Sequence, residues 1–302
     1  MNPTESFDFM PHAPLSIRLR GELMLFDTPK VMGIINATPD SFLASSRVDG
    51  NSADIAGKML EEGADILDIG GYSTRPGAED VSEEEEYDRL APVLDSIRSH
   101  FPEAIISVDT FRAEIARRVI SEFHVDIIND IGGGTLDPDI IPAVAEAGVP
   151  YILMHMRGTP KTMDRLCDYG DVTADVLREL MSNVDRCHSE GIHDVIVDPG
   201  FGFAKNIMQN YRLLNDLDWF HQTGCPVLAG LSRKRMIWQP LDISSTEAGD
   251  ATVCINTIAL LNGADILRVH DVRPAVESVK LINLLRKAGK STPFTINRSL
   301  ND

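Results

Sequence analysis

The sequence predicts an α/β protein built as a single (β/α)₈ barrel, the TIM-barrel architecture. Short apolar runs rich in Val and Ile recur eight times along the 302 residues, and each ends at a polar residue or a glycine. Segments with helical spacing of apolar residues separate these runs. Buried parallel strands have this composition, and their alternation with helices indicates right-handed crossovers. Eight such units in a chain of this length favour the barrel over a doubly wound open sheet, which is the alternative.

The predicted strands are eight apolar runs whose C-terminal ends meet at the mouth of the barrel. In chain order they are Val31–Ile35, Asp65–Ile69, Ala104–Val108, Val125–Ile128, Tyr151–Met154, Asp194–Val197, Pro226–Ala229 and Asp265–Val269. An earlier segment, Ile17–Phe26, is predicted to form a short β-hairpin that covers the barrel bottom. We expect residues 15–289 to form the barrel domain, between a flexible N-terminus (1–14) and a flexible C-terminal tail (290–302).

Helices are predicted between these strands from capping residues and from apolar residues at helical spacing. Ser82 followed by Glu85 forms a capping box at the start of one helix. Asp137 and Pro138 open another, because proline is favoured in the first turn of a helix. The remaining helices are expected to begin at Asn51–Ser52 and to span 112–123, 173–189, 210–221, 246–261 and 274–286.

The overall charge limits the class of partner. The formal net charge is −18 and the isoelectric point is about 4.8, which argues against binding of nucleic acid or an anionic membrane. A local group of Arg and Lys can still bind a small anion. Four scattered cysteines without a C-x-x-C pair indicate reduced thiols. There is no apolar stretch of about 20 residues and no signal-peptide pattern, so we expect a cytoplasmic protein.

Three polar side chains end predicted strands at the mouth: Asp109 the third, Asn129 the fourth and Asp198 the sixth. A carboxylate accepts hydrogen bonds in pairs, whereas an amide both donates and accepts them. Together these groups suit a flat heterocycle with an amino-pyrimidinone edge. For any one of them alone, the alternative is a residue that caps a helix or closes a loop.

Cationic side chains follow other predicted strands. Arg75 lies after the second strand and Lys234 after the seventh, while Arg268 and His270 alternate at the end of the eighth and share one side of it. Barrels commonly bind phosphate at the loops after strands seven and eight. Asn36, at the end of the first strand, is a candidate oxygen ligand for Mg²⁺, which takes few protein ligands. A surface ion pair is the alternative for Arg268 and His270.

Several familiar motifs are incomplete. Residues 200–205 lack the third glycine of a dinucleotide-binding fingerprint, and 230–234 carry Lys where a nucleophile elbow has glycine. The histidines lack zinc-site spacing. The pattern therefore suits an enzyme that positions two substrates and stabilises a leaving anion.

From about residue 31 to about residue 285, the chain resembles the dihydropteroate synthases, a family of pterin-binding enzymes. The motifs that carry the resemblance stand in the family's order: Met32–Phe42, Gly70–Gly77, Ser107–Thr110, Asn129–Asp130, Leu153–Met156, Asp198–Phe203, Gly230–Lys234 and Arg268–Asp271. The resemblance implies a barrel that joins 4-aminobenzoate to 6-hydroxymethyl-7,8-dihydropterin diphosphate and yields 7,8-dihydropteroate and diphosphate. It also implies Mg²⁺ as a cofactor and a homodimer.

The resemblance further implies three groups of site residues. The pterin would be held by Asp109, Asn129, Met154, Asp198 and Lys234. The diphosphate would be held by Asn36, Arg75, Arg268 and His270, with Mg²⁺ on Asn36. The aminobenzoate would be held by Phe42, Thr74, Arg75, Pro76, Phe203, Ser232 and Lys234. Catalysis would rest on Asn36, Asp109, Asp198, Lys234, Arg268 and His270.

The chain departs from the family pattern at four positions. The aspartate usual in the first loop is missing at Ala44, Tyr72 stands where Glu is usual, Gly132 where Ser is common, and Trp238 where a smaller residue is frequent. The loss at Ala44 favours one alternative, a non-catalytic pterin-binding paralogue. Another is a related barrel family that passes a methyl group from methyltetrahydrofolate to a corrinoid. The cations after strands seven and eight argue against that second alternative.

Overall fold

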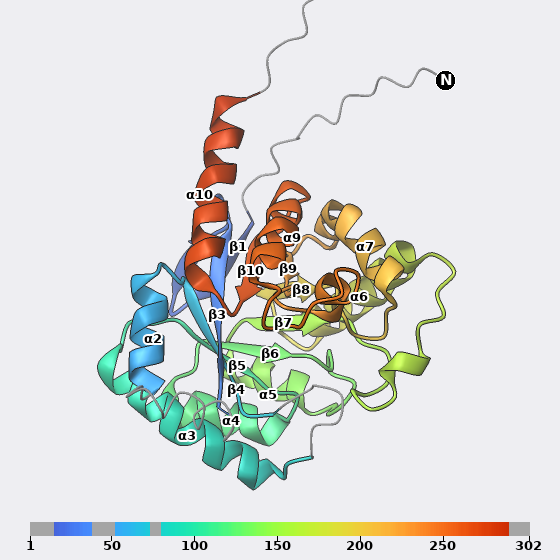
Figure 1. The fold of residues 1–302 in the computed structure, drawn as a ribbon. Helices are drawn as coiled ribbons and strands as arrows, with labels where there is room; N and C mark the ends of the chain where they lie inside the picture. Colours follow the sequence, from blue (N-terminus) through green and yellow to red (C-terminus); the bar gives the residue numbers. More distant parts are fainter. Residues whose placement is uncertain (1–14, 38–51, 73–79, 290–302) are drawn as a thin grey trace, which may run out of the picture.

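Eight parallel strands form the centre of the fold and confirm the predicted barrel (Figure 1). The computed structural model describes residues 15–37, 52–72 and 80–289. The strands are β3 (Lys30–Asn36), β4 (Ile66–Gly70), β5 (Ile106–Asp109), β6 (Ile127–Asp130), β7 (Tyr151–Met154), β8 (Val195–Asp198), β9 (Leu228–Ala229) and β10 (Ile266–Val269). Their order is β8-β7-β6-β5-β4-β3-β10-β9, and a bridge from Val197 to Val227 joins its two ends. The near closure of this ring excludes the doubly wound open sheet.

Helices surround the strands, as the alternating sequence pattern predicts (Figure 1). They are α2 (Ser52–Glu61), α3 (Glu83–His100), α4 (Ala113–Phe123), α5 (Ile140–Ala147), α6 (Val172–Ser189), α7 (Ile207–Asn215), α8 (Arg235–Trp238), α9 (Gly249–Leu261) and α10 (Val272–Ala288), with the 3₁₀-helices η1 (Met163–Arg165) and η2 (Leu217–Thr223). The Ser82 half of the predicted capping box of α3 is present, because the Ser82 side chain accepts a hydrogen bond from the Glu85 amide, while the Glu85 carboxylate pairs with Arg89. Among the described residues, none of these helices is long and apolar enough to cross a membrane.

Three helix predictions need correction. The helix predicted to open at Asp137 begins at Ile140, and Asp137 lies in the turn before it, where Oδ1 accepts from the Asp139 amide at 3.1 Å and Oδ2 from the Ala113 amide at 2.8 Å. The helix predicted over 210–221 is divided into α7 and η2, and α7 begins after a capping box formed by Asn206 and Gln209. The helix predicted over 246–261 begins at Gly249, and the short α8 before it was not predicted.

The predicted N-terminal hairpin is present and covers the barrel bottom. Strands β1 (Ser16–Leu19) and β2 (Glu22–Leu25) pair antiparallel through a turn at Arg20 and Gly21, both with positive φ, which suits a two-residue hairpin. The hairpin buries its apolar side chains against the first inward-facing residues of the barrel strands. This cluster contains Ile17, Leu19, Phe26, Met32, Ile66, Ile127, Ile152, Ile196, Leu228 and Ile266. The bottom is therefore a packed plug, and the mouth is at the opposite end of the strands.

The termini predicted to be flexible, 1–14 and 290–302, lie outside the described residues. So do four of the predicted site residues, Phe42, Thr74, Arg75 and Pro76, as well as Ala44.

Candidate active site

Four strands bring an ion-paired cluster together at the mouth of the barrel. Arg268, on β10, donates from Nε to Asp68 Oδ2 and from Nη2 to Asp109 Oδ2, and both distances are 2.6 Å. Asn129, on β6, donates from Nδ2 to the same Asp68 oxygen at 3.1 Å. Inward-facing positions of β10, β4, β5 and β6 therefore supply one continuous network. Of the three strand-end residues predicted to converge, Asp109 and Asn129 lie in this network, together with Arg268, whereas Asp198, among the described residues, makes no hydrogen bond within it.

Asp68 belongs to this network although the pattern of polar residues at strand ends does not predict it as a site residue. It lies within β4 rather than at its end, and it is fully buried. Its Oδ1 atom is buried and has no hydrogen-bond partner in the described part of the chain. A carboxylate inside an otherwise apolar strand is the signal that could have identified it, because such groups are rarely buried without a partner.

The cluster contains two carboxylates but only one guanidinium group. This excess of negative charge contributes to the shifted pKa values of Asp109 and Arg268. Burial raises the pKa of Asp109 to about 7, the Arg268 charge opposes that rise, and the Asp68 carboxylate adds to it. Burial alone would lower the pKa of Arg268, but Asp68 and Asp109 outweigh it and raise that pKa above its usual range. The cluster therefore favours a ligand that brings N–H donors to Asp109.

A second charged pair lies on the other side of the mouth, where β8 and β9 end. Asp198 Oδ1 accepts a hydrogen bond from the Gly200 amide at 2.7 Å. A Cβ atom on Gly230 would lie 3.7 Å from Asp198 Oδ2 and 3.8 Å from Lys234 Nζ, so both charged groups line the space beside this glycine. Burial raises the pKa of Asp198 and lowers that of Lys234 to about 8, while the attraction between the two charges opposes both shifts.

Lys234 also contacts the turn that follows β8. Its Nζ atom donates a hydrogen bond to the Phe201 carbonyl oxygen and lies 4.8 Å from the centre of the Phe203 ring. An apolar wall rich in methionine continues from Phe203 along the mouth. It consists of buried Ile131, Met154, Met156, Met163 and Ala204, with half-buried Phe111, Leu136 and Phe203 packed against them. Predicted residues Met154, Phe203 and Lys234 therefore border one region, which combines a flat apolar surface with a cation.

The ends of β9 and β10 provide the third part of the site. His270 Nδ1 lies 3.0 Å from Ser232 Oγ, and the same oxygen accepts from the His270 amide at 3.2 Å. A cavity of about 540 Å³ adjoins His270 between α2, α9 and the start of α10. Arg233 is held at its edge by Asp271, with a shortest N–O distance of 2.9 Å. Asn36, which is half-buried, ends the neighbouring strand β3.

Two departures from the family pattern can be read in the structure. Tyr72 donates from its hydroxyl to Asp80 at 2.7 Å, and its ring packs edge-on against Phe111 with centroids 5.2 Å apart. A Cβ atom on Gly132 would lie 2.8 Å from Leu136 Cγ, so glycine allows that leucine to pack close to the loop. Both changes adjust the packing of loops around the mouth and leave the charged clusters in place.

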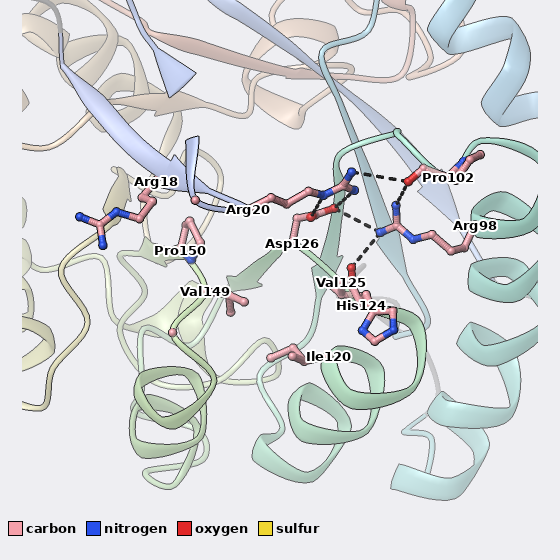
Figure 2. Close-up of a pocket in the computed structure, with 12 residues that line it drawn as sticks. Arg18, Arg20, Arg98, Pro102, Ile120, His124, Val125, Asp126, Val149 and Pro150 are labelled. Atoms are coloured by element: carbon pink, nitrogen blue, oxygen red, sulfur yellow. Dashed lines mark hydrogen bonds and ion pairs between the residues drawn. The ribbon is translucent and has the colours of Figure 1, made fainter. Parts of the chain in front are cut away.

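A second hollow, of about 500 Å³, opens on the opposite face, beside the barrel bottom (Figure 2). Arg20 and Arg98 point toward Asp126, with shortest N–O distances of 2.6 and 3.2 Å, whereas Arg18 points away from them (Figure 2). Asp126 is 6% exposed and also accepts from the Ile106 amide at 2.9 Å. These bonds join the hairpin, α3 and the start of β5, so the arginine cluster stabilises the bottom of the barrel.

The fold and the mouth thus define a (β/α)₈ barrel with a charge-rich site for small molecules. Residues 32–270 match the family described as pterin binding enzyme. The dihydropteroate synthase of Escherichia coli (strain K12) is 44% identical over 272 residues, which cover 88% of this chain and 95% of that protein.

Solved structures give the same result. The Yersinia pestis dihydropteroate synthase in complex with a sulfonamide drug has a TM-score of 0.82 and 38% identity, and the match covers 91% of this chain and 100% of that one. The Xanthomonas albilineans dihydropteroate synthase with 4-aminobenzoic acid has a TM-score of 0.82 and 37% identity, with coverage of 91% and 99%.

The chain belongs to the pterin-binding enzyme family, and its function is that of the dihydropteroate synthases in that family, the transfer of a pterinylmethyl group. The resemblance inferred from the sequence motifs is confirmed.

Proposed function

We propose that the three parts of the mouth divide the dihydropteroate synthase reaction among them. The observation that carries this proposal is the network of Asp68, Asp109, Asn129 and Arg268, because it offers paired acceptors, an amide and a cation to one flat ligand. The substrates are (7,8-dihydropterin-6-yl)methyl diphosphate and 4-aminobenzoate. The products are 7,8-dihydropteroate and diphosphate.

The pterin binds between the two charged clusters. Its amino-pyrimidinone edge donates N–H groups to Asp109 and Asp198, while Asn129 both donates and accepts, and Lys234 donates to the pterin carbonyl oxygen. Met154 packs against the ring. The burial of Asn129, Met154 and Asp198 supports this arrangement, since hydrogen bonds in a buried site are stronger and more selective than those exposed to water.

The diphosphate is held at the ends of β3 and β10. When pterin donors occupy Asp109, the Arg268 Nη2 group loses its present partner and turns to the leaving oxygens, where His270 also donates. Arg75, in the loop after β4, adds a further cation. Ser232 orients the His270 ring through the contact between its hydroxyl and Nδ1.

Asn36 fits Mg²⁺ as one oxygen ligand among several supplied by water and by the substrate's phosphates. The described residues contain no group of three or more His, Cys, Asp or Glu that could hold a metal by themselves, so substrate oxygens would complete the coordination. When bound, Mg²⁺ supplies neutralising charge for the leaving diphosphate.

The aminobenzoate binds beside the pterin, against Phe203, Ser232 and Lys234, with Phe42, Thr74, Arg75 and Pro76 from the loops after β3 and β4. The bond between the pterin methylene carbon and the diphosphate oxygen breaks, and the bonding electrons leave with diphosphate. The resulting cation is delocalised over the pterin and is stabilised by the Asp109 and Asp198 carboxylates. The arylamine nitrogen then forms the C–N bond and releases its proton.

The test is product formation by the purified protein with pterin diphosphate, 4-aminobenzoate and Mg²⁺. We expect dihydropteroate and diphosphate in equal amounts. Calorimetric binding of pterin diphosphate without product would contradict the proposal and would favour the non-catalytic paralogue.

We also propose that the protein is a cytoplasmic homodimer. The four cysteines are free thiols, which suits a reducing compartment.

The dimer interface is proposed on helices α9 and α10, which pack together (Figure 1). Each of the two helices has exposed apolar side chains on one face. They are Ile258 and Leu261 on α9 and Leu281, Leu284 and Leu285 on α10. A second copy of the chain would cover this face, and Leu284→Glu should then convert a dimer to a monomer in light scattering. A monomeric wild-type protein would contradict the dimer.

A further inference from the structure

Lys205 is a buried cation that the proposed reaction does not use. It follows the turn after β8, and it is only 8% exposed. In the described part of the chain no carboxylate oxygen lies within ion-pair distance of its Nζ atom. A lysine buried in this way is uncommon, because an ammonium group without a direct counter-ion is costly to remove from water.

Three acceptors surround the Lys205 ammonium group. Nζ lies 3.0 Å from the Gly200 carbonyl oxygen, 2.9 Å from the Phe203 carbonyl oxygen and 3.0 Å from His155 Nδ1. An ammonium group has three N–H donors, so each of them is used. The two carbonyl groups lie at the two ends of the turn over residues 200–203, and Lys205 therefore clamps this turn.

The contact with Lys205 also determines the tautomer of His155. Because Nδ1 accepts from Lys205, the ring proton is on Nε2, which donates to Glu179 Oε2 at 2.9 Å. Burial, followed by the Lys205 charge, lowers the pKa of His155 to about 4 and so keeps the ring neutral. Glu179 in turn binds the guanidinium group of Arg157. The network thus joins the loop after β8 to the loop after β7 and to α6.

The charges around Lys205 come from four directions. Asp198 lies on β8, Lys234 follows β9, Glu179 is on α6, and Arg157 follows β7. Burial lowers the pKa of Lys205 to about 7, and the Asp198 charge is the main opposing influence. Asp198 is thus coupled to the clamp electrostatically and, through the Gly200 amide, by a hydrogen bond.

The turn needs such a clamp because its backbone is unusual. Gly200, Gly202 and Ala204 all have positive φ, at 73°, 81° and 49°. A Cβ atom on Gly200 would lie 1.9 Å from the His155 carbonyl oxygen, so the turn crosses directly over the end of β7. Glycine adopts positive φ freely, but Ala204 is strained there, and such strain persists only where surrounding contacts over-determine the backbone.

We infer that Lys205 is a positioning residue that sets the aminobenzoate side of the site by fixing Phe203 relative to Asp198. This inference rests on the proposed function, in which Asp198 contacts the pterin and Phe203 contacts the arylamine. Lys234 donates to Phe201 in the same turn, and the Lys205 clamp holds the turn when Lys234 moves to the pterin. Lys205 thereby governs where the arylamine meets the pterin methylene carbon, while it touches neither substrate.

The first experiment compares Lys205→Met with Lys161→Met in steady-state kinetics and calorimetry. Methionine keeps the length and burial of the side chain but cannot donate to the two carbonyl groups. We expect the KM for 4-aminobenzoate to rise about tenfold or more, since charge-assisted hydrogen bonds are lost. The Kd for pterin diphosphate should change by less than about threefold, since the strand-borne pterin contacts remain. Lys161 is 64% exposed and pairs with Asp80, so its loss should change both constants by less than about twofold.

A pair of His155 variants tests whether the hydrogen bond from Lys205 to His155 matters, or only the packing of the His155 ring. This comparison can be made even if Lys205→Met does not fold. In His155→Asn the side-chain oxygen can still accept from Lys205, whereas in His155→Leu it cannot. We expect the asparagine variant to keep the KM for 4-aminobenzoate within about threefold of wild type, and the leucine variant to raise it about tenfold. A purely structural ring would give equal losses in both variants.

Two results would overturn the inference. One is an unchanged KM for 4-aminobenzoate in folded Lys205→Met, and the other is equal behaviour of the two His155 variants. A wild-type protein that forms no product would refute the proposed function instead. In that case, calorimetric binding of 4-aminobenzoate in the presence of pterin and diphosphate still tests the role of Lys205.

Discussion

Replacing Asp68 by asparagine tests the charge balance at the centre of the mouth. In the wild-type protein, Asp68 shares the Arg268 guanidinium group with Asp109, and its negative charge contributes to the raised pKa of Asp109. Asparagine keeps the shape and one acceptor oxygen but removes the charge. Two consequences follow: Arg268 is held less firmly, and Asp109 loses a repulsive neighbour.

The size of each effect follows from the contacts. Asp68→Asn weakens one charge-assisted bond to Arg268, worth about 1.5–3 kcal/mol, so kcat/KM for pterin diphosphate should fall about tenfold to a hundredfold at pH 8. A like charge at this range raises the pKa of a carboxyl group by about 1–2 units, so the pKa of Asp109 should fall by that amount in the variant. Its present value is about 7.

The assay is the pH dependence of kcat/KM, which reports the free enzyme. In Asp68→Asn the acid limb of the profile should move to lower pH, even though the maximum value of kcat/KM is lower than in the wild-type protein. Asp126→Asn is the matched control, because Asp126 is also a buried carboxylate paired with arginines but lies at the barrel bottom. That control should lose stability and keep the acid limb of wild type. An acid limb that stays in place in Asp68→Asn would refute the reasoning.

Three further predictions concern pH, the turn after β8 and the metal. The wild-type profile of kcat/KM against pH should be bell-shaped. Asp109 accepts hydrogen bonds as a carboxylate above its pKa of about 7, and Lys234 donates them as an ammonium group below its pKa of about 8. A profile that is flat from pH 6 to 9 would contradict this. Gly200→Ala should lower the free energy of unfolding, measured in urea, by about 2–4 kcal/mol. Gly200 has a φ of +73°, and the new Cβ atom would meet the His155 carbonyl oxygen. An unchanged midpoint of the urea transition would contradict this geometry of the turn. Chelation of Mg²⁺ should slow diphosphate release about a hundredfold. It should leave the binding of a pterin without diphosphate, measured by calorimetry, unchanged. Equal activity with and without the chelator would show that Mg²⁺ has no role in the reaction.

Much of the fold was predictable because parallel barrel strands are buried on both faces. Their continuous Val and Ile runs stand out against the helices, and the structure has all eight strands where the runs occur. The starts of helices were less certain, because capping residues also serve other purposes. Asp137 resembles a helix start in the sequence, yet its carboxylate caps a turn that precedes α5 and also accepts from the Ala113 amide of the preceding helix.

The candidate site was partly predictable for a similar reason. Residues at strand ends, such as Asp109 and Asn129, are marked by the change from apolar to polar sequence. Asp68 and Lys205 are not marked in this way, because their roles depend on which distant side chains lie beside them. The pairing of Asp68 with Arg268 joins positions 200 residues apart, which periodicity along the chain cannot reveal.

The most direct test of the account is diphosphate release by the purified protein with pterin diphosphate and Mg²⁺, with and without 4-aminobenzoate. Release should accompany dihydropteroate formation and should fall at least about a hundredfold in Asp198→Asn and in Lys234→Ala, because each removes a charged contact to the pterin. Tight pterin binding without release in the wild-type protein, or full activity in both variants, would contradict the central claim that these charges bind the pterin and promote its reaction.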